Sequence, residues 1–128
     1  MLSDSQVVAT IAVNDINAGK QFYGETLGLN QVDENPGGVT YECDGGSMFV
    51  YQSPTAGSGD ATCAFWRIAD GEFEDTVSTL REKGVQFQQY DDLPATTREG
   101  DIHIMDGGQM KAAWFKDPDG NILGLGTG

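Results

Sequence analysis

A strand–turn–strand pattern near the C-terminus constrains the fold more than any other stretch of this 128-residue sequence. Residues 110–116 and 122–125 are apolar enough to form two strands, and Asp117–Gly120 between them has the composition of a tight turn. Pro118 presets φ at the first central turn position, and Gly120 adopts a positive φ at little cost. The pattern therefore predicts an antiparallel hairpin.

The first half of the chain predicts a strand, a helix and then three strands. Residues 7–13 are apolar and β-branched, which is typical of a strand buried on both faces. Asp15 is suited to the N-cap of the following helix, whose apolar stripe includes Tyr23 and Leu27. Gly28 can end this helix in a left-handed conformation. The strands expected after it cover residues 29–33, 39–43 and 47–52.

The same order of elements is predicted again in the second half. A strand at residues 62–68 precedes a helix that has acidic residues in its first turn and Gly84 at its end. Asp70 and Gly84 stand 55 and 56 residues after Asp15 and Gly28, which indicates an internal duplication. The strands expected after this helix cover residues 85–90, 110–116 and 122–125. Between them, residues 91–108 form a long polar stretch with an apolar alternation at 102–105.

A polar linker separates the two copies of the pattern. Residues 53–60, Ser-Pro-Thr-Ala-Gly-Ser-Gly-Asp, have the composition of a loop. We therefore expect a single domain over residues 1–128, with a first module at about 7–52 and a second module at about 61–126.

The quoted motifs resemble those of a known superfamily. The Asp117–Gly120 hairpin, the Val13–Ile16 segment and the Leu27–Leu29 segment resemble the vicinal-oxygen-chelate superfamily, which includes glyoxalases, bleomycin resistance proteins and extradiol dioxygenases. The resemblance covers about residues 7–126. It implies an α+β fold in which two tandem βαβββ modules form an incomplete mixed β-barrel around a cleft. In many of these enzymes, a divalent metal ion acts as a Lewis acid on two neighbouring oxygens of the substrate.

The resemblance also assigns the positions that would carry metal ligands. Counting seven residues back from each helix-opening aspartate gives Val8 and Cys63, and counting four residues on from the turn glycine gives Gly124. On the fourth strand the position is Tyr51 or Gln52. Valine and glycine have no ligand atom, and one thiol with one amide offers too few donors for a catalytic ion. We therefore expect no metal ion at this place and no cofactor.

Side chains that would face the cleft are the candidates for ligand binding. Alternation along the first strand of each module places Thr10, Phe65 and Arg67 on the side of the metal positions. Gly124 and Gly126 are expected to leave space there. Aromatic walls with a few polar groups are typical of small-molecule pockets. The candidate ligand-binding residues are Thr10, Phe49, Tyr51, Phe65, Arg67, Tyr90, His103 and Trp114.

Three side chains with charged or reactive groups are expected to have structural roles. His103 is expected to be a half-exposed strand or loop residue, Arg67 to pair with an acid, and Cys63 to be a buried inert thiol. The alternatives remain open. His103 could act as a base oriented by Asp101 or Asp106, Arg67 could bind an anionic ligand group, and Cys63 could act as a nucleophile.

The charge balance restricts the possible partners. With 20 acidic and 7 basic side chains, the net charge is −13 at pH 7, which argues against nucleic acid and anionic membrane surfaces as partners. Acidic groups spread over the surface explain this charge through solubility, and an acidic groove for a cationic ligand is the alternative. Because the sequence has neither a membrane-spanning run nor the features of a signal peptide, we expect a cytoplasmic protein.

Together these patterns favour a metal-independent, homodimeric protein that binds a small molecule, as in the bleomycin-resistance branch. The ligand is unknown, and the expectation is a cationic or aromatic compound. The alternatives are a glyoxalase-like lyase, isomerase or dioxygenase enzyme, and a domain that binds a protein partner.

Overall fold

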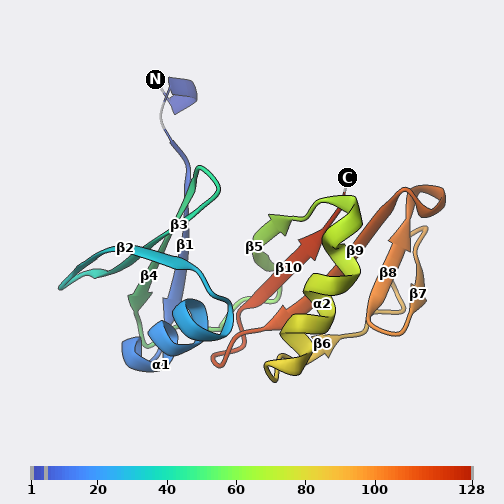
Figure 1. Ribbon diagram of the computed structural model, residues 1–128. Coiled ribbons are helices and arrows are strands. Elements are labelled where there is room, and N and C mark those ends of the chain that lie inside the picture. Colours follow the sequence, from blue (N-terminus) through green and yellow to red (C-terminus); the bar gives the residue numbers. More distant parts are fainter. Residues whose placement is uncertain (1, 5, 128) are drawn as a thin grey trace. The chain divides into compact units, whose positions relative to one another are not determined.

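The computed structural model describes residues 2–4 and 6–127, and the chain divides into two compact units. The first unit runs to residue 59 and also includes residues 118–121, and the second unit comprises residues 60–117 and the chain from 122 onward. Each unit contains one mixed β-sheet and one α-helix (Figure 1). The α+β class predicted from the sequence is confirmed.

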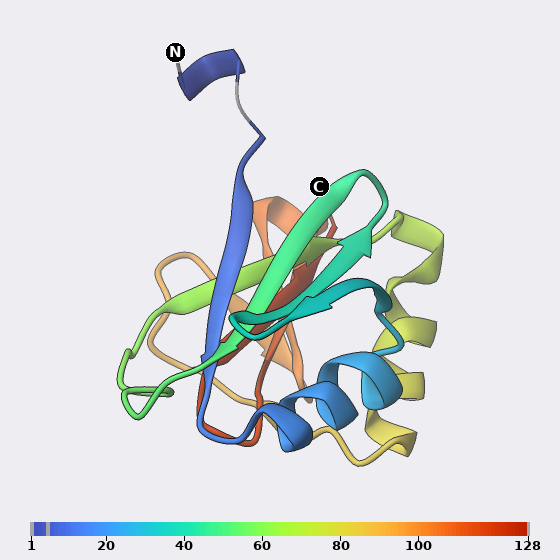
Figure 2. The same cartoon turned by 90° about the vertical axis from the view of Figure 1, so that its left-hand side faces the viewer.

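The first unit has a four-stranded sheet with the order β1-β4-β3-β2. In this sheet β1 and β4 are parallel, and the other neighbours are antiparallel. The sheet faces the viewer in Figure 2, with β1 in blue. The elements are β1 (Val8–Val13), α1 (Ile16–Lys20), β2 (Asn30–Asn35), β3 (Gly38–Cys43) and β4 (Gly46–Gln52).

The helix of the first unit begins and ends where the sequence predicts. The Asp15 carboxylate accepts the Asn17 N–H at 2.8 Å and so caps α1. The helix then continues as a π-helical segment, Gln21–Thr26, and Gly28 follows with φ of 72°. The strand expected at residues 29–33 is displaced, since β2 covers Asn30–Asn35.

Alternation along the strands produces the core of the first unit. Ile11 and Val13 on β1 are buried, whereas Val8 and Thr10, which alternate with them along the strand, are exposed. The other buried apolar side chains of this unit are Tyr23, Val39, Tyr41, Met48 and Val50.

The tip of the C-terminal hairpin, Pro118–Asn121, packs with the first unit. The Asp119 carboxylate accepts the Asn14 N–H at 3.1 Å. The Asn121 side-chain amide donates to the Ala12 carbonyl at 2.7 Å. The turn is therefore bonded to the end of β1, which is a role that its local sequence does not reveal.

The second unit has the sheet order β5-β10-β9-β8-β7, and β6 also pairs with β9. The outer strand β5 is parallel to β10, as β1 is to β4, so both units repeat the parallel pairing of a first and a last strand. The elements are β5 (Thr62–Arg67), α2 (Phe73–Glu82), β6 (Phe87–Gln88), β7 (Thr97–Glu99), β8 (Ile102–Met105), β9 (Met110–Lys116) and β10 (Ile122–Gly126).

The hairpin prediction is confirmed, and two other predictions for the second unit are corrected. β9 and β10 pair antiparallel across the turn, in which Gly120 has φ of 92°. Asp70 makes no side-chain cap, because Asp70–Glu72 is a 3-10 turn that precedes α2. The strand expected at 85–90 is limited to β6. The long polar stretch 91–108 contains the β7–β8 hairpin, and β8 coincides with the apolar alternation at 102–105.

α2 lies against one face of the second sheet (Figure 1). Its buried side chains, Phe73, Val77 and Leu80, provide the apolar stripe predicted from the sequence. Within residues 2–4 and 6–127, neither α1 nor α2 has the length and apolar content that a membrane span requires.

Candidate functional site

The second sheet presents two chemically different faces. Phe115 is fully buried, and its ring centroid lies 5.7 Å from that of Phe87. The guanidinium carbon of Arg81 on α2 lies 5.8 Å from the Phe87 ring centroid. These contacts identify the α2 face of the sheet. Because side chains alternate, Trp114 and Lys116 point to the opposite face, which we call the distal face.

A pocket of about 440 Å³ opens on the distal face, within the range typical of small-molecule sites. All of its lining residues belong to the second unit. They combine two aromatic rings with an amide, a hydroxyl and two opposite charges. The lining residues are Asp60, Ala61, Thr62, Gln88, Tyr90, Leu93, Trp114, Lys116 and Ile122.

His103 supports the aromatic wall of this pocket from behind. The Tyr90 and Trp114 rings pack edge to face, with their centroids 5.7 Å apart. The centroid of the His103 ring lies 4.9 Å from that of Trp114. His103 is fully buried, and its Nε2 accepts the Tyr90 N–H at 3.0 Å. A backbone N–H can only donate, so Nε2 is unprotonated and Nδ1 carries the ring proton. Among the described residues, Nδ1 has no hydrogen-bond partner.

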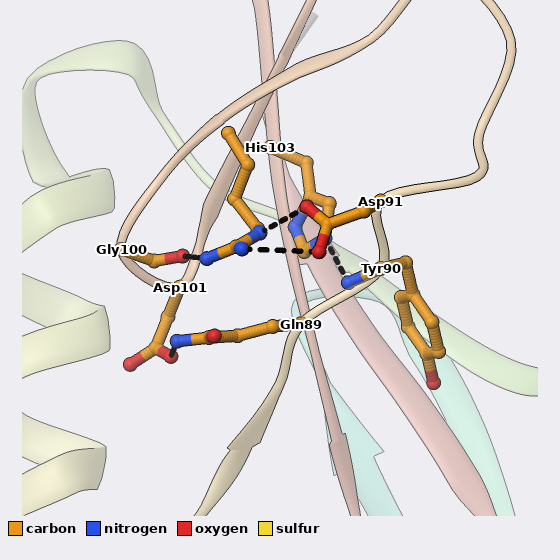
Figure 3. Close-up of polar contacts among 7 residues, drawn as sticks. Gln89, Tyr90, Asp91, Gly100, Asp101 and His103 are labelled. Carbon is orange, nitrogen blue, oxygen red and sulfur yellow. Dashed lines mark hydrogen bonds and ion pairs between the residues drawn. The ribbon is translucent and has the colours of Figure 1, made fainter.

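The segment that carries Tyr90 is held at three consecutive residues (Figure 3). Gln89 donates its side-chain amide to Asp101 at 3.1 Å. Arg98 donates Nε and Nη2 to the two carboxylate oxygens of Asp91, at 2.9 and 3.2 Å. With the Tyr90–His103 bond, these contacts join residues 89–91 to the β7–β8 hairpin and so fix the pocket wall.

The Arg98–Asp91 pair gives a pH-dependent prediction. Hydrogen bonding from Arg98, followed by its positive charge, lowers the pKa of Asp91. A lowered pKa means that this pair stabilises the fold above the unfolded-state pKa of about 3.9, and that the contribution is lost as pH falls through the folded-state pKa. We expect Arg98→Met to raise the Asp91 pKa toward its ordinary value, as measured by NMR titration of the carboxyl carbon.

A matched control for this titration is Lys20→Met in the first unit. Lys20 pairs with Glu34 at 2.9 Å and lowers the pKa of that carboxyl. This variant should raise the pKa of Glu34 and leave that of Asp91 unchanged. An Asp91 titration that is the same with and without Arg98 would contradict the pairing.

Five of the predicted ligand-binding residues lie in the second unit, and the structure separates their roles. Tyr90 and Trp114 line the pocket. His103 lies behind them, so the expectation of a half-exposed histidine is wrong. Arg67 is exposed and lies outside the pocket. Within the described part of the chain it forms no ion pair, so the expected pairing with an acid is also wrong. Phe65 is 47% exposed on β5.

The space expected at Gly124 and Gly126 is occupied by aromatic rings. A Cβ at Gly124 would lie 2.8 Å from the Phe65 ring and 3.0 Å from Trp114. A Cβ at Gly126 would lie 2.4 Å from Phe65 and 3.0 Å from the Lys111 carbonyl. The glycines therefore admit the Phe65 and Trp114 rings onto the sheet, and do not leave an opening.

The other three predicted residues, Thr10, Phe49 and Tyr51, share one face of the first sheet. Thr10 pairs with Phe49 between β1 and β4, and the Phe49 and Tyr51 rings stack with centroids 6.2 Å apart. None of the three lines the pocket of the second unit.

Strand pairing identifies the fourth-strand position that corresponds to Gly124. The 55-residue offset relates Thr10 to Phe65, whose partner on β10 is Gly124. The partner of Thr10 on β4 is Phe49. Phe49 is therefore the counterpart of Gly124, in place of the Tyr51 or Gln52 expected from the sequence.

The family's metal positions thus hold Val8, Phe49, Cys63 and Gly124. Cys63 is exposed, so the expected buried thiol is wrong. Its Sγ nevertheless lies 3.4 Å from the Ile122 carbonyl oxygen and donates to it. Partial burial is the main cause that raises the pKa of the Cys63 thiol, and the negative charge of Asp117 is the second cause. Among the described residues, no three His, Cys, Asp or Glu side chains cluster in a way that could hold a metal ion. This donor set does not fit a catalytic ion.

Sequence reasoning missed several residues of the pocket and its support. Alternation from Trp114 along β9 could have found Lys116, which faces the same way two residues later. Gln88 depends on the pairing of β6 with β9, and Leu93 lies in a loop without a sequence signal. The support from Arg98 required knowledge of the β7–β8 hairpin.

A family model described as the Glyoxalase/Bleomycin resistance protein/Dioxygenase superfamily matches residues 5–125. The chain belongs to this superfamily. This confirms the resemblance that the hairpin and the repeated module indicate. Comparison with curated protein sequences found no match.

Solved structures with the same fold include enzymes and a binding protein. Lactoylglutathione lyase from Agrobacterium tumefaciens is 15% identical, with a TM-score of 0.73 over 98% of this chain and 94% of the other. TnmS3, an antibiotic binding protein from a Streptomyces species, is 24% identical, with a TM-score of 0.70 over 99% and 98%. A glyoxalase/bleomycin resistance protein/dioxygenase from Alicyclobacillus acidocaldarius is 18% identical, with a TM-score of 0.70 over 97% and 91%.

Proposed function

We propose that this protein binds a small organic molecule in the pocket of its second unit, without using a metal ion. The observation that carries the proposal is the aromatic wall formed by Tyr90 and Trp114, held in place by His103 and the β7–β8 hairpin. An aromatic wall that is rigid before binding loses little conformational freedom when a ligand stacks on it. This arrangement favours a ligand with an aromatic or other planar apolar part.

The chemistry of the family's metal positions supports binding without a metal. Val8, Phe49 and Gly124 carry no ligand atom, and a raised thiol pKa at Cys63 reduces the thiolate that would bind a metal. A carboxylate at position 124 would also have to displace Phe65 and Trp114. TnmS3 is described as an antibiotic binding protein, so the fold is known to serve binding as well as enzymes. A homodimer remains part of the proposal, to be checked by light scattering.

A thermal-shift experiment in the presence of EDTA tests the proposal. A ligand that binds only the native state adds about 2.7 kcal/mol at a concentration of 100 times its Kd. We expect a panel of naphthalene and quinoline compounds to contain members that raise the melting temperature. Trp114→Leu should abolish this rise relative to its own ligand-free protein.

The control variant is Phe22→Leu, which changes a partly buried aromatic residue of the first unit that does not line the pocket. It should keep the ligand-induced rise. A panel without any stabilising compound, or a rise that requires added metal, would count against metal-independent binding.

A further inference from the structure

The pocket contains a basic side chain, Lys116, that forms no ion pair with any other described residue. Four of the seven basic residues form ion pairs, which are Lys20–Glu34, Arg81–Asp101, Arg98–Asp91 and Lys111–Glu74. Lys116 makes no ion pair within residues 2–4 and 6–127. Lys116 is exposed and lines the pocket, so its ammonium group is accessible to a bound ligand.

Two other polar side chains of the lining can donate hydrogen bonds to a ligand. Gln88 lies opposite Trp114 on β6 and offers an amide NH2, and Thr62 offers a hydroxyl. Asp60 is the only acidic residue of the lining, and it lies at the exposed end of the linker. An oxyanion near Lys116 can accept from both the ammonium and the amide, whereas a cation there would be repelled by Lys116.

We infer that the pocket selects a planar aromatic ligand with an anionic group such as a carboxylate, whose ring contacts Tyr90 and Trp114 and whose oxygens bind Lys116. This inference rests on the proposed function and makes its ligand class specific. It differs from the cationic ligand that is one of the expectations from the sequence. At 0.1 M salt the Debye length is about 10 Å, so distant acidic groups are largely screened, whereas a contact with Lys116 is not.

Three probes with one ring system test the ligand class. These are 2-naphthoate, 2-naphthalenemethanol and 2-naphthylmethylammonium, titrated calorimetrically at 0.1 M salt in EDTA. We expect 2-naphthoate to bind about tenfold more tightly than the alcohol and the ammonium compound to bind most weakly, as one ionic contact near a protein surface predicts. Lys116→Met keeps the apolar stem and should weaken 2-naphthoate about tenfold, without changing the alcohol.

Asp60→Asn is the matched control, because it changes the other charge of the lining. Because it removes a carboxylate from the lining, it should strengthen the binding of 2-naphthoate, which is opposite to the effect of Lys116→Met. Equal binding of all three probes would overturn the ligand class but not the pocket. The same holds if the ammonium compound binds most tightly and Asp60→Asn weakens its binding. If none of the probes binds, both the ligand class and the proposed pocket are contradicted.

Discussion

Replacing Gly57 with alanine is expected to lower the free energy of unfolding by about 3 kcal/mol. Gly57 has φ of 73°, which L-residues adopt only at a cost. A Cβ there would also lie 1.8 Å from the carbonyl oxygen of Asp119, and that oxygen belongs to backbone that cannot rotate away. The variant should therefore disturb the hairpin tip, whose Asp119 and Asn121 side chains bond to the end of β1. Urea unfolding measures the loss.

Gly59→Ala is the matched control for this experiment. Gly59 lies in the same linker, and a Cβ there would meet no atom within 4 Å. We expect the control to change the free energy of unfolding by less than about 0.5 kcal/mol. Equal stabilities of the two variants would show that the linker does not lie against the hairpin tip as described.

Replacing His103 with alanine is expected to cost about 3 kcal/mol, from a buried cavity and an unsatisfied Tyr90 N–H. The side chain is fully buried and its Nε2 accepts that N–H at 3.0 Å. The variant should also weaken ligand binding, because Tyr90 loses the contact that holds it in the pocket wall. Urea unfolding and probe titration of the same protein measure the two effects.

His103→Phe separates the hydrogen bond from the packing. Phenylalanine is somewhat larger than histidine, so it leaves no cavity. It also removes the Nδ1 atom that has no partner among the described residues, but it cannot accept the Tyr90 N–H. We expect a smaller loss of stability, about 1 kcal/mol, with weakened ligand binding. If His103→Phe bound the probe as tightly as the native protein, the hydrogen bond would not be what positions Tyr90.

The sequence was sufficient to predict elements whose signals are local. The turn at Asp117–Gly120 and the helix ends at Gly28 and Gly84 depend on backbone angles that glycine and proline favour, and all three glycines have positive φ. Asp15 caps α1 because its carboxylate reaches a backbone N–H two residues later. The repeated order of elements followed from these signals, and the match to the family model agrees with it.

The remaining features depend on contacts between distant residues. Residues 97–105 form a hairpin although Arg98, Glu99 and Asp101 make the segment polar, because Arg98 and Asp101 are paired with Asp91 and Arg81. No local period shows such pairs. His103 is buried for the same reason, since the strand that carries it is recognisable only after the hairpin is known.

Of the candidate residues, Tyr90 and Trp114 line the pocket, and the error at Gly124 and Gly126 has a clear physical cause. Alternation placed Phe65 on the same face as Gly124, but it does not give the direction in which a large ring extends. The Phe65 ring lies over the neighbouring strand, so the glycine positions that looked empty are filled. Side-chain volume across paired strands, which alternation ignores, decides where a pocket can form.

Metal analysis of the purified protein tests most directly the claim that the site works without a metal ion. Protein purified without chelator should contain far less than one equivalent of zinc, nickel, iron or manganese per chain. The account would be contradicted by one equivalent of metal that resists dialysis. That metal would also have to be lost when a family metal position is changed, as in Cys63→Ser.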